Sequence, residues 1–328
     1  MATVTTANVR LASLPPAAGQ AGLRGALASE FTKIRSVRST YWTLGALFIV
    51  SVGLAVAITA GSAANFANNP GNKAGFDATQ TSLGAFFEIG QLIIAVLGAM
   101  VITSEYSTGM IRTSLTAQPR RGVVYAAKAI AFTSVTLVIS IVTSFIAFFA
   151  GQAMLSGKGV AASLFHTVTI PANANVTCLG GPGGGKGPGG GGPGPGPGCG
   201  HLVVTFSGTD VITASTVLTA IIGTALFVTI VALIAFGVGS IVRHTAGAIA
   251  IVIALMFIIP ILEHTLPDNW RFDIMRFLPD AANQVVSLTI ASNGPGHLWS
   301  AWPQLGVTAL WAVVLVGIGA YLFRKRDA

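Results

Sequence analysis

Long apolar segments without charged residues recur along the chain and predict its fold class. A helix needs about 20 apolar residues to cross the hydrocarbon core of a bilayer, and five charge-free windows contain such a stretch or nearly so. A sixth apolar segment, 83–103, is interrupted only by Glu88. A soluble alternative would need several fully buried helices with no outer layer to cover them. The five windows are 39–72, 129–157, 211–242, 245–262 and 298–323.

The pattern therefore predicts an all-α integral membrane protein with six transmembrane helices and both termini in the cytoplasm. Composition agrees, because only 9% of the 328 residues are charged, whereas soluble domains carry about 25%. The expected spans, with ends uncertain by a few residues, are 41–60, 83–103, 129–151, 213–236, 245–263 and 304–323. Together they form one six-span unit, 41–328.

The distribution of basic residues predicts the orientation. With cytoplasmic termini, most of the 18 lysines and arginines fall in inner segments, as the positive-inside rule requires. The outer segments hold Lys73, Lys158, Lys186, Arg271 and Arg276. The net charge of +8 therefore reflects membrane topology. We expect no nucleic-acid partner, because the basic residues flank spans and form no single patch with aromatic side chains.

The segment before the first span predicts two further elements. Residues 1–22 are expected to be a mobile cytoplasmic tail, and no cleavable signal is expected, because about forty residues precede an apolar run long enough to span. Residues 23–40 predict an amphipathic helix at the inner interface, in contact with membrane lipids; an ordinary basic flank is the alternative. Its apolar residues are Leu23, Leu27, Phe31 and Ile34, and Lys33, Arg35 and Arg38 project elsewhere.

The longest inner loop, 104–128, predicts a short cytoplasmic helix. Ser104 can cap a helix start with Glu105 in its first turn, and Pro119 ends it. Gly109 is a poor helix former, so a break or a close backbone approach is expected near it. A solvated loop without a partner would fit the same residues.

The outer segment between the third and fourth spans contains a flexible Gly/Pro-rich insertion, 178–200. Residues 180–200 are almost entirely Gly and Pro and cannot bury enough apolar area to order the chain. Cys178 and Cys199 are the two cysteines of the chain, and a disulfide between them is possible on the outer face. Two unpaired thiols are the alternative, and no metal site is expected, because only His201 lies near them.

Few residues suggest chemistry inside the membrane. Ionisable groups within spans are functional candidates, so Glu88 could contact a cationic substrate or relay protons; a carboxylate near the outer headgroups that reaches water is the favoured alternative. Gly180 to Lys186 matches the spacing of a phosphate-binding loop but lacks the following Ser or Thr and the flanking strand and helix. The five histidines have no ligand spacing. We expect no enzyme activity and no cofactor in this chain.

Three segments resemble the permease subunits of bacterial type-2 ABC exporters. They are S-E-F-T-K-I-R-S-V-R-S-T-Y-W-T at 29–43, V-I-T-S-E-Y-S-T-G-M-I-R-T-S-L-T-A-Q-P-R-R at 101–121 and G-V-G-S-I-V-R-H-T-A-G-A-I-A at 237–250. A looser similarity covers 266–282. The Gly/Pro-rich insertion departs from the family pattern and carries no family role.

The resemblance implies a half-transporter in the bacterial plasma membrane. Two permease chains, with a homodimer favoured over a heterodimer, would pair with two copies of a cytoplasmic ABC ATPase that binds ATP and Mg²⁺. The helix after the second span would be a coupling helix that enters a groove of the ATPase. This assigns to the partner interface Ser104, Glu105, Tyr106, Gly109, Met110, Arg112, Pro119, Arg120 and Arg121, supported by Glu30, Phe31, Lys33, Ile34 and Arg35 of the interfacial helix.

Two other function classes stay open at this stage. One is a six-span channel or carrier that works without ATP, and the other is a membrane scaffold that transports nothing. Transport by the purified chain alone would favour the carrier. An ATPase that docks without any substrate-stimulated hydrolysis would favour the scaffold. The substrate cannot be identified from these residues; hydrophobic drugs, peptides or lipids are what the resemblance implies.

Overall fold

A bundle of long helices makes up the computed structural model, which describes residues 22–73, 76–117, 119–165, 168–179, 201–263, 265, 267, 274, 277–279 and 301–325. The predicted six-span helical membrane fold is confirmed within these ranges. The mean hydropathy of each span window is 2.1 or more. The six helical segments long and apolar enough to cross a membrane are Thr40–Phe66, Ala78–Ser107, Arg121–Leu155, Ala214–Val242, Thr245–Leu262 and Trp302–Lys325.

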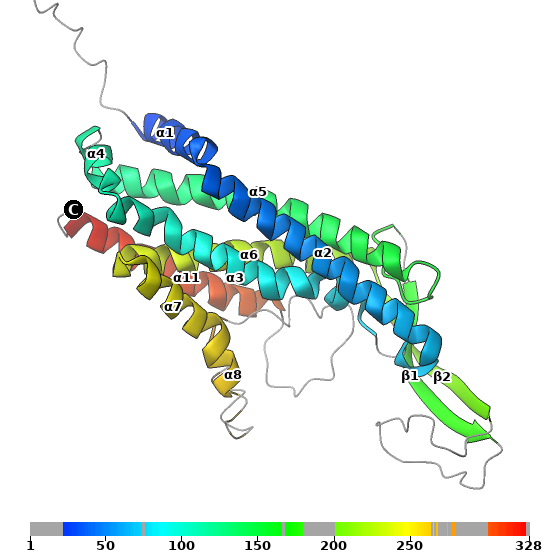
Figure 1. The fold of residues 1–328 in the computed structure, drawn as a ribbon. Helices are drawn as coiled ribbons and strands as arrows, with labels where there is room; N and C mark the ends of the chain where they lie inside the picture. Colours follow the sequence, from blue (N-terminus) through cyan, green and yellow to red (C-terminus); the bar gives the residue numbers. More distant parts are fainter. Residues whose placement is uncertain are drawn as a thin grey trace, which may run out of the picture.

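The elements follow one another in an up-and-down order along the bundle. Helices α1 and α4 and the C-terminal end of α11 lie at one end, and a β-hairpin lies at the other (Figure 1). The predicted tail, 1–22, lies outside the described residues except for Gly22. The elements are α1 Leu23–Ser36, α2 Arg38–Asn68, η1 Pro70–Lys73, α3 Ala78–Ser107, α4 Met110–Ala117, α5 Arg121–Leu155, β1 Val168–Leu179, β2 His201–Ile212, α6 Ala214–Val242, α7 Thr245–Ile253, η2 Ala254–Ile258, α8 Ile259–Glu263 and α11 Ala301–Lys325.

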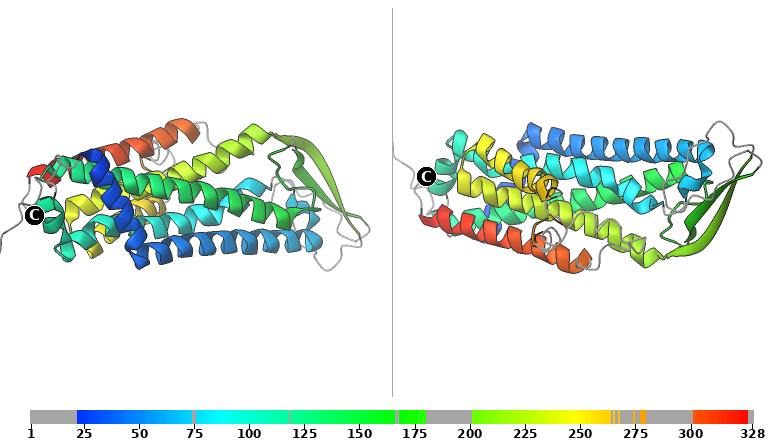
Figure 2. Two further views of the ribbon diagram at one scale, coloured as in Figure 1. Left: turned by 90° about the horizontal axis from the view of Figure 1, so that it is seen from above. Right: turned by 90° about the horizontal axis from the view of Figure 1, so that it is seen from below.

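Helices α3 and α6 form the centre of the bundle. Their span windows are 61% and 67% buried, against 33% or less for the other four, and they pack along each other with α2, α5, α7 and α11 around them (Figure 2). Aromatic rings fill this core: Phe87 of α3 stacks on Phe227 of α6 with ring centroids 5.0 Å apart. Phe236 of α6 contacts the ring of Tyr125 on α5 at 5.3 Å.

Glycines allow α3 and α6 to approach each other closely. A Cβ at Gly98 would lie 2.5 Å from the carbonyl oxygen of Ala232, and one at Gly239 would lie 2.9 Å from the carbonyl oxygen of Ala99. Small residues at helix interfaces serve this purpose in membrane proteins. Gly53, by contrast, would place its Cβ in open space. Helix glycines in this chain are thus of two kinds that the sequence does not distinguish.

The extramembrane hairpin was absent from the all-helical prediction. Strands β1 and β2 pair antiparallel, with Val168 opposite Ile212 and Leu179 opposite His201. Strand β2 is rich in Val, Thr and Ile, the β-branched residues that favour strands. Long charge-free windows do not reveal these 12-residue strands, because polar residues such as Asn, Thr, Ser and Asp interrupt their apolar residues. The Gly/Pro-rich residues 180–200, which join the strands, lie outside the described residues.

The fifth span contains a π-helical turn, η2, between α7 and α8. Pro260 lies two residues after the end of this turn. A proline lacks a backbone N–H, and its ring displaces the carbonyl four residues earlier, here that of Met256 within η2. The wider π turn accommodates the proline while the helix continues to Glu263.

Replacement of Gly98 by Ala is expected to destabilise the bundle by about 1–3 kcal/mol, because the added methyl group meets the backbone of α6. Gly53→Ala is the matched control, with an expected change between zero and a stabilisation of about 1 kcal/mol, since alanine favours helix and the site is open. Thermal unfolding of the purified protein in detergent measures both. Equal melting temperatures for the two variants would contradict the packing role of Gly98.

Candidate functional site

Four charged side chains from three helices meet at the end of the bundle that carries α4. They are Glu30 and Lys33 of α1, Glu105 near the end of α3, and Lys128 of α5; we call them the ion cluster. Helix α1 lies across α5 at this end (Figure 2). The ion cluster therefore joins the first helix to the second and third spans.

Short contacts connect all four members. The Lys128 ammonium donates to Glu30 Oε2 and to Glu105 Oε1, each at 2.7 Å. The Lys33 ammonium donates to Glu30 Oε1 at 2.8 Å and to Glu105 Oε1 at 3.2 Å. Two cations and two carboxylates alternate, so the ion cluster has no net charge. Each carboxylate is thereby bound by both lysines.

Because the ion cluster is largely buried, the loss of any one charged partner is expected to destabilise it. The side chains of Lys128, Glu30 and Glu105 are 5%, 6% and 8% exposed, whereas that of Lys33 is 31% exposed. Removing one partner of a buried ion pair typically costs about 3–5 kcal/mol, because a buried charge is left uncompensated. Glu105 Oε2 is also buried and has no hydrogen-bond partner among the described residues, so Glu105 depends wholly on its other oxygen.

Opposite charges set the pKa values of the two α1 members. Burial alone would raise the pKa of the Glu30 carboxyl, but Lys128 and Lys33 outweigh burial and hold this pKa below its ordinary value of 4.5. Burial alone would lower the pKa of the Lys33 ammonium, but Glu30 and Glu105 hold this pKa above its ordinary value of 10.5. Both groups are therefore charged at neutral pH.

Helix α1 packs on the bundle through its polar side. Ala26 and Glu30 are its buried residues, and Lys33 continues the same stripe one turn later. Leu23 and Phe31, from the predicted apolar side, are 43% and 39% exposed. Apolar side chains that point away from the protein suit an acyl-chain boundary. The charged stripe is therefore the most deeply buried side of α1, whereas Leu27 and Ile34 of the apolar side are half-buried.

The short helix of the inner loop begins later than predicted. Ser104, Glu105 and Tyr106 belong to the last turn of α3, so Ser104 does not cap a new helix. The break comes at Gly109, whose φ of +71° lies in the left-handed region that favours glycine. Helix α4 then runs from Met110 to Ala117. The predicted break near Gly109 is confirmed, and the predicted start at Ser104 was wrong.

Helix α4 is linked to the ion cluster on one side and exposed on the other. Ser114 Oγ accepts a hydrogen bond from the Lys33 ammonium at 3.2 Å, and Ile111 is 2% exposed. The opposite face is exposed and carries Met110, Arg112, Thr113 and Thr116, followed by Pro119 and Arg120. We call these six residues the α4 face.

The other inner-loop residues predicted to contact the ATPase do not lie on the α4 face. Ser104 is exposed, and Arg121, the first residue of α5, is half-buried. Tyr106 is half-buried beneath Arg243, whose guanidinium carbon lies 4.8 Å from the ring centroid. Glu105 lies in the ion cluster and does not reach the surface that its assignment to a docking face requires. Its nearest partner is Lys128, one of the basic residues of the predicted inner segments.

The other candidates lie away from the ion cluster. Glu88 is exposed on α3, ten residues after Ala78, or about 15 Å along the helix. Cys178 lies in β1, but Cys199 lies outside the described residues, so the disulfide stays a prediction. Within the described ranges, no group of three or more His, Cys, Asp or Glu is placed to hold a metal ion.

A comparison with protein families finds a match over part of the chain. Residues 26–178 match the family described as ABC-2 family transporter protein. The match supports an ABC-2 type permease. The predicted resemblance is confirmed for this part of the chain, which contains the whole ion cluster and α4. No curated protein matches the chain. The match supports a role in transport, and the six helices long and apolar enough to cross a membrane support a multi-pass membrane protein.

Lys128→Met is expected to release α1 from the bundle, because Glu30 and Glu105 would keep only the more exposed Lys33. The expected loss is about 3 kcal/mol of α1 docking free energy. A spin label on Ala28→Cys, an exposed α1 position, in a background with Cys178 and Cys199 replaced by Ser, measures the mobility of α1. Arg24→Met on the exposed side of α1 is the control and should leave the spectrum unchanged. Unchanged mobility in Lys128→Met would contradict the docking role.

The same label should report a defined pH range for α1 docking. The pKa of Glu30 is lowered in the folded protein, so its stabilisation is complete above 4.5 and is lost as the pH falls through the lower folded value. The pKa of Lys33 is raised, so its stabilisation is complete below 10.5 and is lost as the pH rises through the higher folded value. Mobility should stay constant between these limits, and a transition near neutral pH would refute this interpretation.

Proposed function

We propose that this chain is the transmembrane subunit of an ABC exporter in the bacterial plasma membrane. It forms the substrate pathway as one of two permease chains, and two copies of a separate cytoplasmic ATPase supply the energy. That partner binds ATP and Mg²⁺ and hydrolyses the ATP. The observation that carries the proposal is α4, a short helix with one exposed face, held to two spans and to α1 by the ion cluster.

The charge of the α4 end supports a cytoplasmic location. Described lysines and arginines at this end include Arg38, Arg112, Arg120, Arg324 and Lys325, and cytoplasmic ends of spans carry an excess of basic residues. The hairpin end would then face the outside. This orientation puts α4 where ATP is available.

The contacts of α4 give a route for mechanical coupling. A push on the α4 face is transmitted through Ser114 to Lys33, and through Gly109 along the backbone to α3. Lys33 is bound to Glu105 of α3, which is bound to Lys128 of α5. Packed helices move as bodies between discrete arrangements. The ion cluster therefore makes α1, α3, α4 and α5 respond as one body.

Each part of this route has a different expected role. The α4 face binds the ATPase, and Arg112 at its centre is the type of residue that dominates interface energetics. Glu105 is a positioning residue, because it is buried and acts through Lys33 and Lys128. Arg112 and Glu105 are seven residues apart and yet should give different phenotypes when they are changed.

The test uses the permease co-expressed with its ATPase and reconstituted in proteoliposomes. Arg112→Glu is expected to lower ATPase association about tenfold, whereas Glu105→Gln should preserve association and abolish substrate-stimulated hydrolysis and export. Lys158→Glu makes the same charge change as Arg112→Glu at the hairpin end and should have no effect. Association is measured by co-purification, and coupling by ATP hydrolysis with and without substrate.

Several outcomes would contradict the proposal. Export by the permease alone would indicate a carrier, and an ATPase that binds without any stimulation by candidate substrates would indicate a scaffold. Labelling of Thr113→Cys by an impermeant thiol reagent in intact cells, with Cys178 and Cys199 replaced by Ser, would place α4 outside. Export at the wild-type rate by Glu105→Gln would show that the ion cluster has no coupling role. It would not contradict docking of the ATPase on the α4 face.

A further inference from the structure

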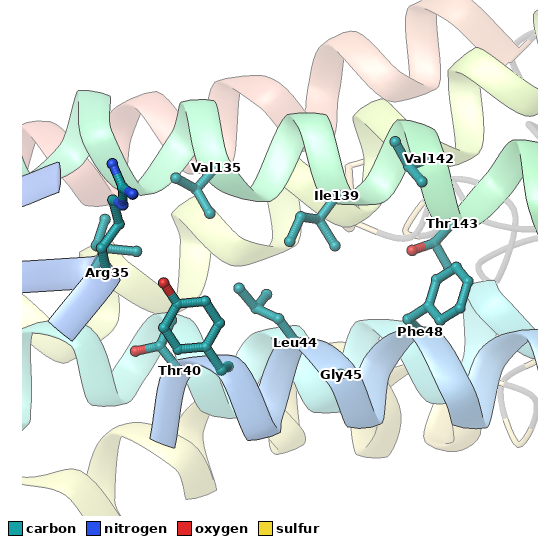
Figure 3. Close-up of a pocket in the computed structure, with 11 residues that line it drawn as sticks. Arg35, Thr40, Leu44, Gly45, Phe48, Val135, Ile139, Val142 and Thr143 are labelled. Atoms are coloured by element: carbon teal, nitrogen blue, oxygen red, sulfur yellow. The ribbon is translucent and has the colours of Figure 1, made fainter. Parts of the chain in front are cut away.

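An apolar groove runs along the outside of the bundle between α2 and α5. Its walls are formed by Leu44, Gly45 and Phe48 of α2 and by Val135, Ile139 and Val142 of α5 (Figure 3). Its volume is about 510 Å³, within the range of ligand sites, about 300–1,000 Å³. From Val135 to Val142 it extends about 10 Å along the helix axis. The groove can therefore hold an extended apolar chain.

Gly45 creates part of the empty space. A Cβ added at Gly45 would meet nothing within 4 Å, so this glycine does not serve close helix packing. Val142 is 48% exposed, which shows that the groove opens toward the surroundings of the bundle. In a membrane-spanning segment those surroundings are lipid.

The end of the groove near α1 is polar and basic. Arg35 of α1 and Thr40 of α2 line this end (Figure 3), together with Tyr41. Arg35 and the neighbouring Arg38 are exposed. Both described acidic residues at this end of the bundle, Glu30 and Glu105, are bound by lysines of the ion cluster. Among the described residues, Arg35 has no carboxylate partner.

The surroundings of this end place it at the depth of lipid headgroups. Trp42 is 80% exposed and Tyr41 is 58% exposed, and exposed Trp and Tyr gather at membrane interfaces. Helix α1 turns Phe31 away from the protein in the same region. An arginine at headgroup depth above an apolar groove is complementary to a molecule with a phosphate at one end and an acyl chain at the other.

We propose that the groove binds an anionic phospholipid of the membrane. Its phosphate is held by Arg35 with the hydroxyls of Thr40 and Tyr41 nearby, and one acyl chain lies between α2 and α5. The bound lipid fills the space that Gly45 leaves open and ties α1 to the first and third spans from the side opposite the ion cluster. This site does not depend on coupling to an ATPase.

Native mass spectrometry of the delipidated permease in detergent, titrated with phosphatidylglycerol or phosphatidylcholine, tests the proposal. Phosphatidylglycerol should bind at least tenfold more tightly. Arg35→Gln should remove this preference, and Arg24→Gln, on the same helix but outside the groove, should keep it. Gly45→Leu should block binding of both lipids at this site, whereas Gly53→Leu, at an equally open position of α2, should not.

Four results would overturn the proposal. One is equal affinity for the two lipids in the wild-type protein, and another is unchanged selectivity in Arg35→Gln. The third is a groove covered by a second copy of the chain, which disulfide formation between Val142→Cys copies in membranes would reveal. Displacement of phosphatidylglycerol by inorganic phosphate at similar concentration would likewise show an anion site without an acyl chain. Melting temperatures of Arg35→Gln and Gly45→Leu near that of wild type establish that both variants are folded.

Discussion

The contacts of Lys128 with Glu30 and Glu105 determine how the α4 end of this protein is organised. A lysine seven residues into a helix that spans the membrane is costly unless it is paired. Its two carboxylates come from α1 and α3, so the pairing requires that both helices lie against α5. Lys33 then neutralises the second negative charge and reaches α4 through Ser114. One buried cation thus specifies the positions of four helices.

These contacts also determine which side of the amphipathic helix α1 faces the protein. A helix bound through its apolar face would have no reason to keep Leu23 and Phe31 exposed. Because α1 is bound through Ala26, Glu30 and Lys33, its apolar residues stay available to lipid. The same orientation places Arg35 beside the groove between α2 and α5. Protein contact and lipid contact are therefore divided between two sides of one helix.

The spans could be predicted from the sequence because the absence of charge over about 20 residues has one dominant physical cause. The hairpin could not, since its strands mix polar and apolar residues and are separated by a long Gly/Pro-rich segment. The ion cluster was missed for another reason: Glu105 looked like part of an exposed loop, and Lys128 looked like a flanking charge. A useful signal was present, because Glu105 and Lys128 have opposite charges and stand near the adjoining ends of consecutive spans.

The two kinds of helix glycine show what a sequence pattern leaves undetermined. Gly98 and Gly239 bring α3 and α6 into backbone contact, and Gly45 leaves a space that no described side chain fills. The first arrangement gives the bundle a rigid centre, while the second leaves a cavity at its periphery. A rigid α3–α6 pair would carry a displacement of α4 along the whole length of the bundle. A peripheral groove lies outside that pair, so its occupant can adjust the position of α1 without loosening the centre.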